Sequence, residues 1–142
     1  MTPGSAIDYS VIEKKIKEVH REHPLIELVY DQWNARDLVQ RLEETERMTC
    51  VECIQGMKSL TGPAKFLERL VLEKRLRHGG HPILTWNAEN TQVYVDNNEN
   101  YRPVKGKNNT KKIDGIMATI DALSRAMFDD VSVYERRGML EM

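Results

Sequence analysis

The sequence of 142 residues has the length of one domain, and a chain of this size buries about two-thirds of the surface that it exposes when unfolded. Apolar residues make up 40% of the chain, and 21 basic side chains nearly balance 22 acidic ones. This composition excludes a disordered or fibrous protein, and a net charge of -1 excludes a general attraction to nucleic acid, which would need a local basic patch.

The chain carries no sequence signal for a membrane or for export. It has no run of about 18 apolar residues, and its first five residues lack the basic flank and apolar stretch of a signal peptide. We therefore expect a cytoplasmic protein with no membrane contact. Cys50 and Cys53 lie in an apolar segment typical of a strand, where their side chains point to opposite faces, so we expect both to be buried, unbonded thiols.

Apolar spacing along the chain alternates between helical and extended patterns, which predicts an α/β layered domain. A first helix begins at a cap supplied by Asp8 or Ser10 and ends at Pro24. The apolar run over residues 25–30 predicts a buried strand that stops at Asp31. A carboxylate directly after such a strand lies at the edge where open α/β sheets usually place their sites.

The middle of the chain continues this alternation. We expect a second helix over residues 34–44, capped by its first residue, and a strand over residues 48–54. A loop over residues 55–62 then leads to a third helix, which Pro63 opens and which continues toward His78.

The last part of the chain predicts a short helix, a hairpin and a long helix. Pro82 opens the short helix, and residues 91–96 and 101–105 form the two strands of the hairpin. A helical apolar stripe then begins near Lys111, with Asp114 in its first turn.

Two interpretations of Asp114 remain open on the spacing alone. The helix dipole favours negative charge in a first turn, so helix stability would explain the residue. Asp114 also begins a second face with Ala118 and Asp121, beside the apolar stripe, from which a carboxylate could point along the edge of the core into a cleft.

Several short motifs occur in an order that resembles one known family. Residues 76–90 (LRHGGHPILTWNAEN) are similar to a signature of the large terminase subunit of tailed bacteriophages, although His81 stands where Asn is commoner. Separate motifs in one order are more specific than any one of them, and here they point to the C-terminal nuclease domain of that subunit. The other matching segments are residues 2–4, 7–9, 30–35, 55–56, 59–60, 112–115 and 133–138.

The resemblance implies a ribonuclease H-like fold, a mixed sheet flanked by helices, in which aspartates hold two divalent metal ions. The family's second and third acidic positions match Asp31 and Asp114, so we expect these two residues to be catalytic and to bind Mg²⁺ or Mn²⁺. Carboxylate oxygens suit these hard ions, and paired metals suit phosphodiester hydrolysis. Asp8 and Asp121 could add ligands, but a solvated surface charge is the simpler interpretation of both.

The family's first acidic position and its ATPase domain match no part of this sequence. We therefore expect residues 1–142 to form a single, partial, N-terminally truncated nuclease domain with no ATPase domain, in which at least one metal binds poorly. An exposed sheet edge left by the missing strands would favour self-association.

A basic segment directly before Asp114 is the candidate DNA contact. Phosphates are bound by lysines with flexible, hydrogen-bonding neighbours, and a solvated loop is the alternative. The four lysines are Lys105, Lys107, Lys111 and Lys112. Basic residues over positions 69–77 are more simply explained as surface charges that complement a helix dipole.

The four histidines suggest a competing zinc site, since imidazole is a common zinc ligand. They occur as two pairs with a spacing of three, each at the end of a helix, and this position makes a zinc site the weaker hypothesis. The pairs are His20 with His23 and His78 with His81.

The family resemblance, with the aspartates and lysines that match it, leaves two possible functions. The first is a metal-dependent endonuclease domain of a phage DNA-packaging terminase, which cuts concatemeric double-stranded DNA in the cytoplasm of the bacterial host. The resemblance implies the portal protein and the small terminase subunit as its partners. The second is a non-catalytic prophage remnant or fragment that binds DNA or packaging proteins.

Overall fold

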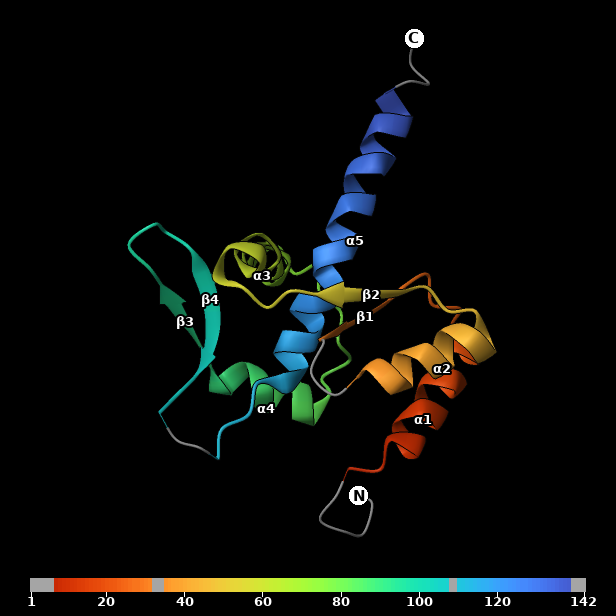
Figure 1. Cartoon of the computed structure of the whole chain (residues 1–142). Coiled ribbons are helices and arrows are strands. Elements are labelled where there is room, and N and C mark those ends of the chain that lie inside the picture. Colours follow the sequence, from red (N-terminus) through yellow and green to blue (C-terminus); the bar gives the residue numbers. More distant parts are fainter. Residues whose placement is uncertain (1–6, 32–34, 108–109, 139–142) are drawn as a thin grey trace. The chain divides into compact units, whose positions relative to one another are not determined.

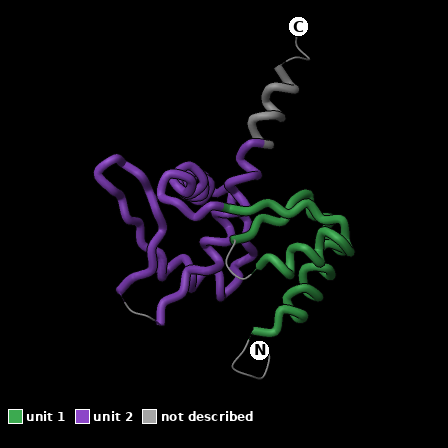
Figure 2. Tube along the Cα trace, viewed as in Figure 1, with its two compact units in different colours: residues 1–53 green, residues 54–142 purple. Residues whose placement is uncertain are grey.

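The computed structural model describes residues 7–31, 35–107 and 110–138, with the backbone alone described from residue 129 onward. It divides the chain into two compact units, unit 1 (residues 1–53) and unit 2 (residues 54–142), which Figure 2 colours separately. Each unit combines helices with one two-stranded sheet and has its own small core.

Unit 1 is built around a parallel strand pair joined by a helix. Its elements are α1 (Tyr9–Glu22), β1 (Leu28–Asp31), α2 (Arg36–Glu46) and β2 (Cys50–Cys53), labelled in Figure 1. Parallel strands need a crossover connection, and α2 supplies it. Asp31 pairs with Cys53 at the carboxyl end of this sheet.

The core of unit 1 forms where the apolar faces of its helices meet. Leu42 is fully buried, and Leu38 and Met48 are buried beside it. Ile16 of α1 packs against this cluster. The α1 helix begins at Asp8, whose carboxylate accepts from the Ser10 N–H at 2.9 Å, so Asp8 is the cap.

Unit 2 packs two long helices and a hairpin around a second core. Its elements are α3 (Met57–Leu72), α4 (Pro82–Asn90), β3 (Thr91–Val95), β4 (Tyr101–Lys105) and α5 (Asp114–Gly138). The strands β3 and β4 are antiparallel. The core residues are Leu60, Ala64 and Leu67 of α3 with Ile120 of α5.

Most predicted boundaries in unit 2 are confirmed. The α4 helix begins at Pro82, and the hairpin spans the predicted segments. The hairpin turn is held by Asp96, whose carboxylate accepts from the Asn98 and Asn100 N–H groups at 2.8 Å each. The last helix carries Asp114 as its first residue.

The start predicted for the third helix was wrong. Pro63 lies inside α3, which begins at Met57, so residues 57–62 are helical rather than a loop. The Gly56 N–H donates to the Ser59 hydroxyl at 3.1 Å at the start of the helix, and Pro63 is buried in unit 2. Local preference for proline at a first helical position is thus overridden by burial.

The predicted end of the third helix was also wrong. The helix stops at Leu72 rather than continuing toward His78. Lys74 adopts a positive φ of 56°, and the N–H groups of Arg75 and Leu76 both donate to the Leu70 carbonyl, which closes the helix end.

Unit 1 shows smaller shifts from the prediction. The β1 strand begins at Leu28 rather than at residue 25, and Asp31 is its last residue rather than the residue after it. The α2 helix begins at Arg36, and the predicted cap Asn34 lies outside the described residues. We expected one mixed sheet. The described residues form a parallel pair of strands in unit 1 and an antiparallel pair in unit 2.

The cysteines form no disulfide, as predicted. Cys53 is buried, whereas Cys50 is only half-buried, which corrects the expectation that both are buried. Partial burial, with the Glu43 carboxylate nearby, raises the pKa of the Cys50 thiol and keeps it protonated at neutral pH.

Candidate active site

The start of α5 places Asp114 at the surface of unit 2. Asp114 is the first residue of the helix and its side chain is exposed. The following N–H, that of Gly115, donates to the Asn87 side-chain oxygen at 2.7 Å, and the Met117 N–H donates to the Ile113 carbonyl at 2.9 Å. The helix therefore starts at a defined residue, and the Asp114 carboxylate projects from a fixed backbone.

Asp114 lines a pocket of about 530 Å³ within unit 2. The pocket combines buried apolar residues, such as Leu60 and Pro103, with exposed polar ones. Its polar lining consists of one carboxylate, one amide and two cations. These four residues are Asp114, Gln55, Arg102 and Lys105.

This lining suits an anionic ligand that also carries a metal ion. Arg102 and Lys105 provide permanent positive charge for phosphate oxygens, and the Asp114 carboxylate provides hard oxygen donors for a divalent cation. The pocket thus places one carboxylate beside a guanidinium and an ammonium group.

Asp121 lies two turns after Asp114 on α5 and is only 7% exposed. Gln55, from the segment before α3, donates to its carboxylate across 3.2 Å. The alternative of a solvated surface charge is therefore wrong for Asp121, because α5 turns this side chain toward the segment that precedes α3. Asp8, by contrast, is an exposed helix cap in unit 1, and hydrogen bonds from Ser10 lower the pKa of its carboxyl.

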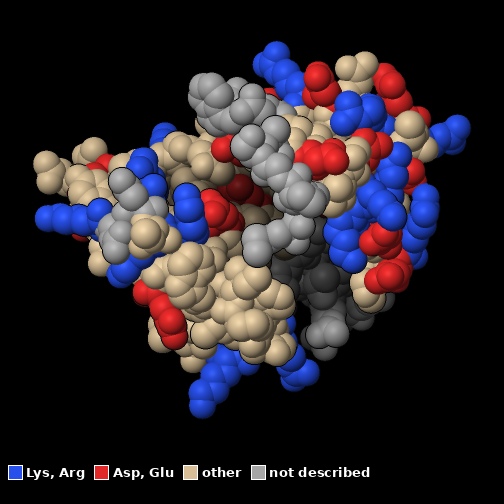
Figure 3. Space-filling view, turned by 90° about the horizontal axis from the view of Figure 1, so that it is seen from below, with Lys and Arg blue, Asp and Glu red and all other residues tan. Residues whose placement is uncertain are grey.

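The predicted DNA-binding lysines surround the hairpin and the start of α5. Lys105, Lys107 and Lys112 are exposed, and Lys111 is half-buried. In Figure 3 basic side chains lie on both the left and the right of the face, interspersed with acidic ones. Among the four, Lys105 shares the pocket with Asp114.

Sequence reasoning missed Arg102 and Gln55 as parts of this site. Arg102 stands between Tyr101 and Pro103 in a hairpin strand, and an isolated cation among less polar neighbours is a signal that the sequence did contain. Gln55 lies in the matching segment 55–56, but its place in the pocket follows from the packing of α3 against α5.

Asp31 belongs to unit 1, where it ends β1 and is half-buried. Its oxygens are suitable donors for Mg²⁺ or Mn²⁺. A shared metal site of Asp31 and Asp114 stays a prediction. In the described part of the chain, no three His, Cys, Asp or Glu side chains form a group that could hold a metal ion.

The histidines are used differently in the two units. His20 accepts the Leu25 N–H through Nδ1 at 3.0 Å, so this ring fixes the turn between α1 and β1. His78 and His81 are exposed on either side of two glycines with positive φ.

The residues that the structure describes include no helix long and apolar enough to cross a membrane.

Comparison with known proteins identifies the family. The model of the terminase large subunit endonuclease domain matches residues 1–130. The chain belongs to this family. The large terminase subunit of Enterobacteria phage HK97 is 34% identical over 118 residues, which cover 82% of this chain and 23% of that protein.

One further relative and one solved structure agree. Protein YmfN of Escherichia coli K12 is 32% identical over 142 residues, or 99% of this chain and 30% of that protein. The crystal structure of the HK97 large terminase matches with a TM-score of 0.75 and 32% identity over 87% of this chain and 26% of that one. The chain thus spans 23% to 30% of the length of these relatives, and its predicted α/β, ribonuclease H-like fold is confirmed.

Proposed function

We propose that this chain is a metal-dependent DNA endonuclease domain of a phage packaging terminase, in which Asp31 and Asp114 hold Mg²⁺ or Mn²⁺. The substrate is concatemeric double-stranded DNA, cut by two-metal phosphodiester hydrolysis. The observation that carries the proposal is the pocket of unit 2, where an exposed aspartate at a helix start lies with two cations. Membership of the endonuclease domain family supports it.

The DNA backbone would run over the hairpin side of unit 2. Arg102 and Lys105 line the pocket itself, and Lys107 and Lys112 are exposed in the chain that leads from β4 to α5. Because phosphate contacts position DNA without reading its sequence, such a surface suits cutting with little sequence preference. The near-neutral charge of the whole chain makes this local patch the source of attraction.

Hydrolysis adds water across a phosphorus–oxygen bond and leaves one phosphate end and one hydroxyl end. Bound metal ions supply an activated water and stabilise the charge that develops on the phosphate. Asp31 and Asp114 would hold these ions, and Arg102 and Lys105 would orient the phosphate oxygens. Gln55, which bonds Asp121, would keep the wall of the pocket in place.

Manganese binding tests the metal site directly. At a free Mn²⁺ concentration tenfold above its Kd, stability rises by about 1.4 kcal/mol, and the melting temperature rises by roughly 3–6 °C. We expect Asp31→Asn and Asp114→Asn to remove most of this gain while leaving the metal-free fold intact. Asp37→Asn, an equal charge change at an exposed position of α2, is the matched control.

Binding and cleavage of plasmid DNA test the rest of the proposal. Replacing Lys105 by Ala should weaken binding and reduce the slope of log affinity against log salt by about 0.9. Lys14→Ala, on the exposed surface of α1, should leave both unchanged. Nicking in Mn²⁺ that disappears in Asp114→Asn supports the endonuclease. DNA binding with no nicking, in protein that does bind Mn²⁺, supports the non-catalytic alternative instead.

Partners and place of action follow from the same proposal. The portal protein and the small terminase subunit are the proposed protein partners, and the cytoplasm of the bacterial host is the proposed place of assembly. Self-association through an exposed strand edge also stays a prediction, which sedimentation at high protein concentration would test.

A further inference from the structure

Two asparagines of α4 contact the chain on both sides of Asp114. Asn87 and Asn90 are 3% and 7% exposed, so both are buried polar residues. The Asn87 side-chain oxygen accepts the Gly115 N–H at 2.7 Å. The Asn90 side-chain amide donates to the Lys112 carbonyl at 3.3 Å. One bond lies just after Asp114 and the other two residues before it.

The orientation of the Asn87 amide is fixed by a second bond. Its nitrogen donates to the Ile83 carbonyl at 3.1 Å, one turn back along α4. The donor and acceptor ends of the group are therefore both engaged, and the oxygen can only face α5. A buried amide with both ends bonded has little freedom to rotate, because any rotation would leave a buried polar group unsatisfied.

Gly115 makes this close approach possible. A Cβ at residue 115 would lie 3.2 Å from the Asn87 side-chain oxygen and 3.2 Å from a methyl carbon of Leu84. Such contacts are tighter than most side chains accept, so a larger residue would force the Asn87 and Leu84 side chains to shift by a few tenths of an ångström. Glycine thus allows the first turn of α5 to lie directly on Asn87.

We infer that Asn87 and Asn90 are positioning residues that hold the peptide units around Asp114, so that its carboxylate stays at the pocket. This inference rests on the proposed role of Asp114 as a metal ligand. An aspartate at the first residue of a helix would otherwise fray with the helix end. Partners of this kind, one step removed from the metal, typically change metal affinity about 10- to 100-fold.

The test measures Mn²⁺ affinity and amide hydrogen exchange on the whole chain, well below the melting temperature. In Asn87→Ala we expect faster exchange of the Gly115 amide and a loss of Mn²⁺ affinity of about tenfold. Asn87→Asp keeps the oxygen that accepts the Gly115 N–H but loses the amide that donates to the Ile83 carbonyl, so we expect an intermediate loss of both properties. Thr85→Ala is the matched control, because the Thr85 hydroxyl donates within α4 to His81.

A second variant protects the test against a general loss of folding. Gly115→Ala keeps both asparagines but crowds the contact, so we expect lower Mn²⁺ affinity with protection of the α3 core amides unchanged. Wild-type affinity in both Asn87→Ala and Gly115→Ala, with affinity lost in Asp114→Asn, would overturn the positioning role and leave the proposed function standing. No Mn²⁺ binding by the wild-type chain would overturn the proposed function, and the positioning role with it.

Discussion

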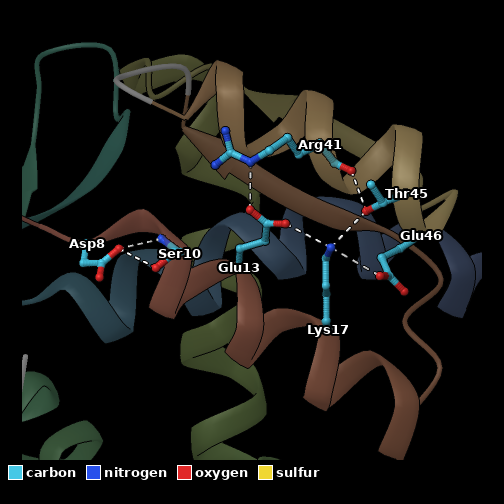
Figure 4. Close-up of polar contacts among 7 residues, drawn as sticks. All are labelled: Asp8, Ser10, Glu13, Lys17, Arg41, Thr45 and Glu46. Carbon is cyan, nitrogen blue, oxygen red and sulfur yellow. Dashed lines mark hydrogen bonds and ion pairs between the residues drawn. The ribbon is translucent and has the colours of Figure 1, made fainter.

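Unit 1 and unit 2 differ in where their polar contacts lie. In unit 1 the contacts between helices are made by charged side chains near the surface. Glu13 of α1 bonds Arg41 of α2 at 2.8 Å and Lys17 at 2.9 Å, and Lys17 reaches Glu46 at 3.4 Å. Figure 4 shows Glu13 and Lys17 at the centre of this network, which also includes Thr45.

In unit 2 several contacts between elements are made by neutral side chains bonded to backbone. The amide of Asn87 bonds Gly115 of α5, and the amide of Asn90 bonds Lys112, two residues before α5 begins. The Thr61 hydroxyl of α3 accepts the Tyr101 N–H at 3.0 Å and so joins the start of β4 to α3. These bonds link elements that lie far apart in the sequence.

The two kinds of contact differ in what they can do. Charged pairs near the surface are weakened by salt and pH and contribute little to stability. Buried neutral bonds are costly to break, because the group left behind loses its partner away from water. The hydrogen bonds around the start of α5, which carries Asp114, are thus costly to break. The ion pairs of unit 1, by contrast, change in strength with salt and pH.

Truncating the core tests whether each unit keeps its own stability. Leu42 is fully buried in unit 1, and Ile120 is 1% exposed in unit 2. We expect Leu42→Ala and Ile120→Ala each to cost about 3 kcal/mol through lost burial and a cavity. Amide hydrogen exchange should localise the first loss to unit 1 and the second to unit 2.

Exposed apolar positions provide the control for these substitutions. Ile26 is 82% exposed in unit 1 and Leu72 is 76% exposed in unit 2, so Ile26→Ala and Leu72→Ala should change stability little. Equal loss of protection in both units after Leu42→Ala would contradict the separation, because it would mean that the units unfold as one.

Local signals in the sequence predicted the fold of unit 2 well wherever they were strong. The start of α4 at Pro82 is confirmed, and Asp114 lies in the first turn of α5 as predicted, although that helix begins at Asp114 and not near Lys111. Pro63 misled the prediction, because burial in unit 2 outweighs its preference for a first helical position. Secondary structure is predictable where the local and tertiary preferences agree.

The candidate site was predictable only in part for the same reason. Asp114 was predicted from the family resemblance and Lys105 from a basic segment, and both line the pocket. Contacts between Asn87 and Gly115, 28 residues apart, and between Asn90 and Lys112, 22 residues apart, leave no local pattern. The sequence alone does not show which backbone group a neutral amide contacts in the folded chain.

A matched pair of threonine substitutions compares the two kinds of contact at equal chemistry. Thr61→Val removes the acceptor of the half-buried Tyr101 N–H, so we expect a loss of about 1–2 kcal/mol. Thr45→Val, on the exposed face of α2, removes bonds that water can replace and should cost less than about 0.5 kcal/mol. Urea denaturation of both variants gives the difference, and equal losses would remove the distinction between the units.

Dependence on pH is expected to be a smaller effect and to occur in both units. Hydrogen bonds from Arg41 and Lys17 lower the pKa of Glu13 in the folded state below its ordinary 4.5. In unit 2, hydrogen bonds from Asn100 lower the pKa of Asp96 below 3.8. A lowered folded pKa gives stability that is present above the ordinary value and lost as pH falls through the folded value. Acid should therefore weaken both contacts.

Salt should reduce the stability contribution of one of these two carboxylates more than that of the other, because their partners differ in charge. Glu13 is held by two cations, whereas Asp96 is held by N–H groups of Asn98 and Asn100. At about 1 M salt the Debye length is about 3 Å, so the attraction between exposed charges is largely screened. We expect the stability difference between wild type and Glu13→Gln to shrink in salt at neutral pH, and that for Asp96→Asn to persist. Urea denaturation of wild type and both variants, with and without salt, measures the two stability differences in the same protein. If the stability contribution of Glu13 does not change with salt, hydrogen-bond geometry rather than charge joins α1 to α2. The contrast between the units would then rest on burial alone.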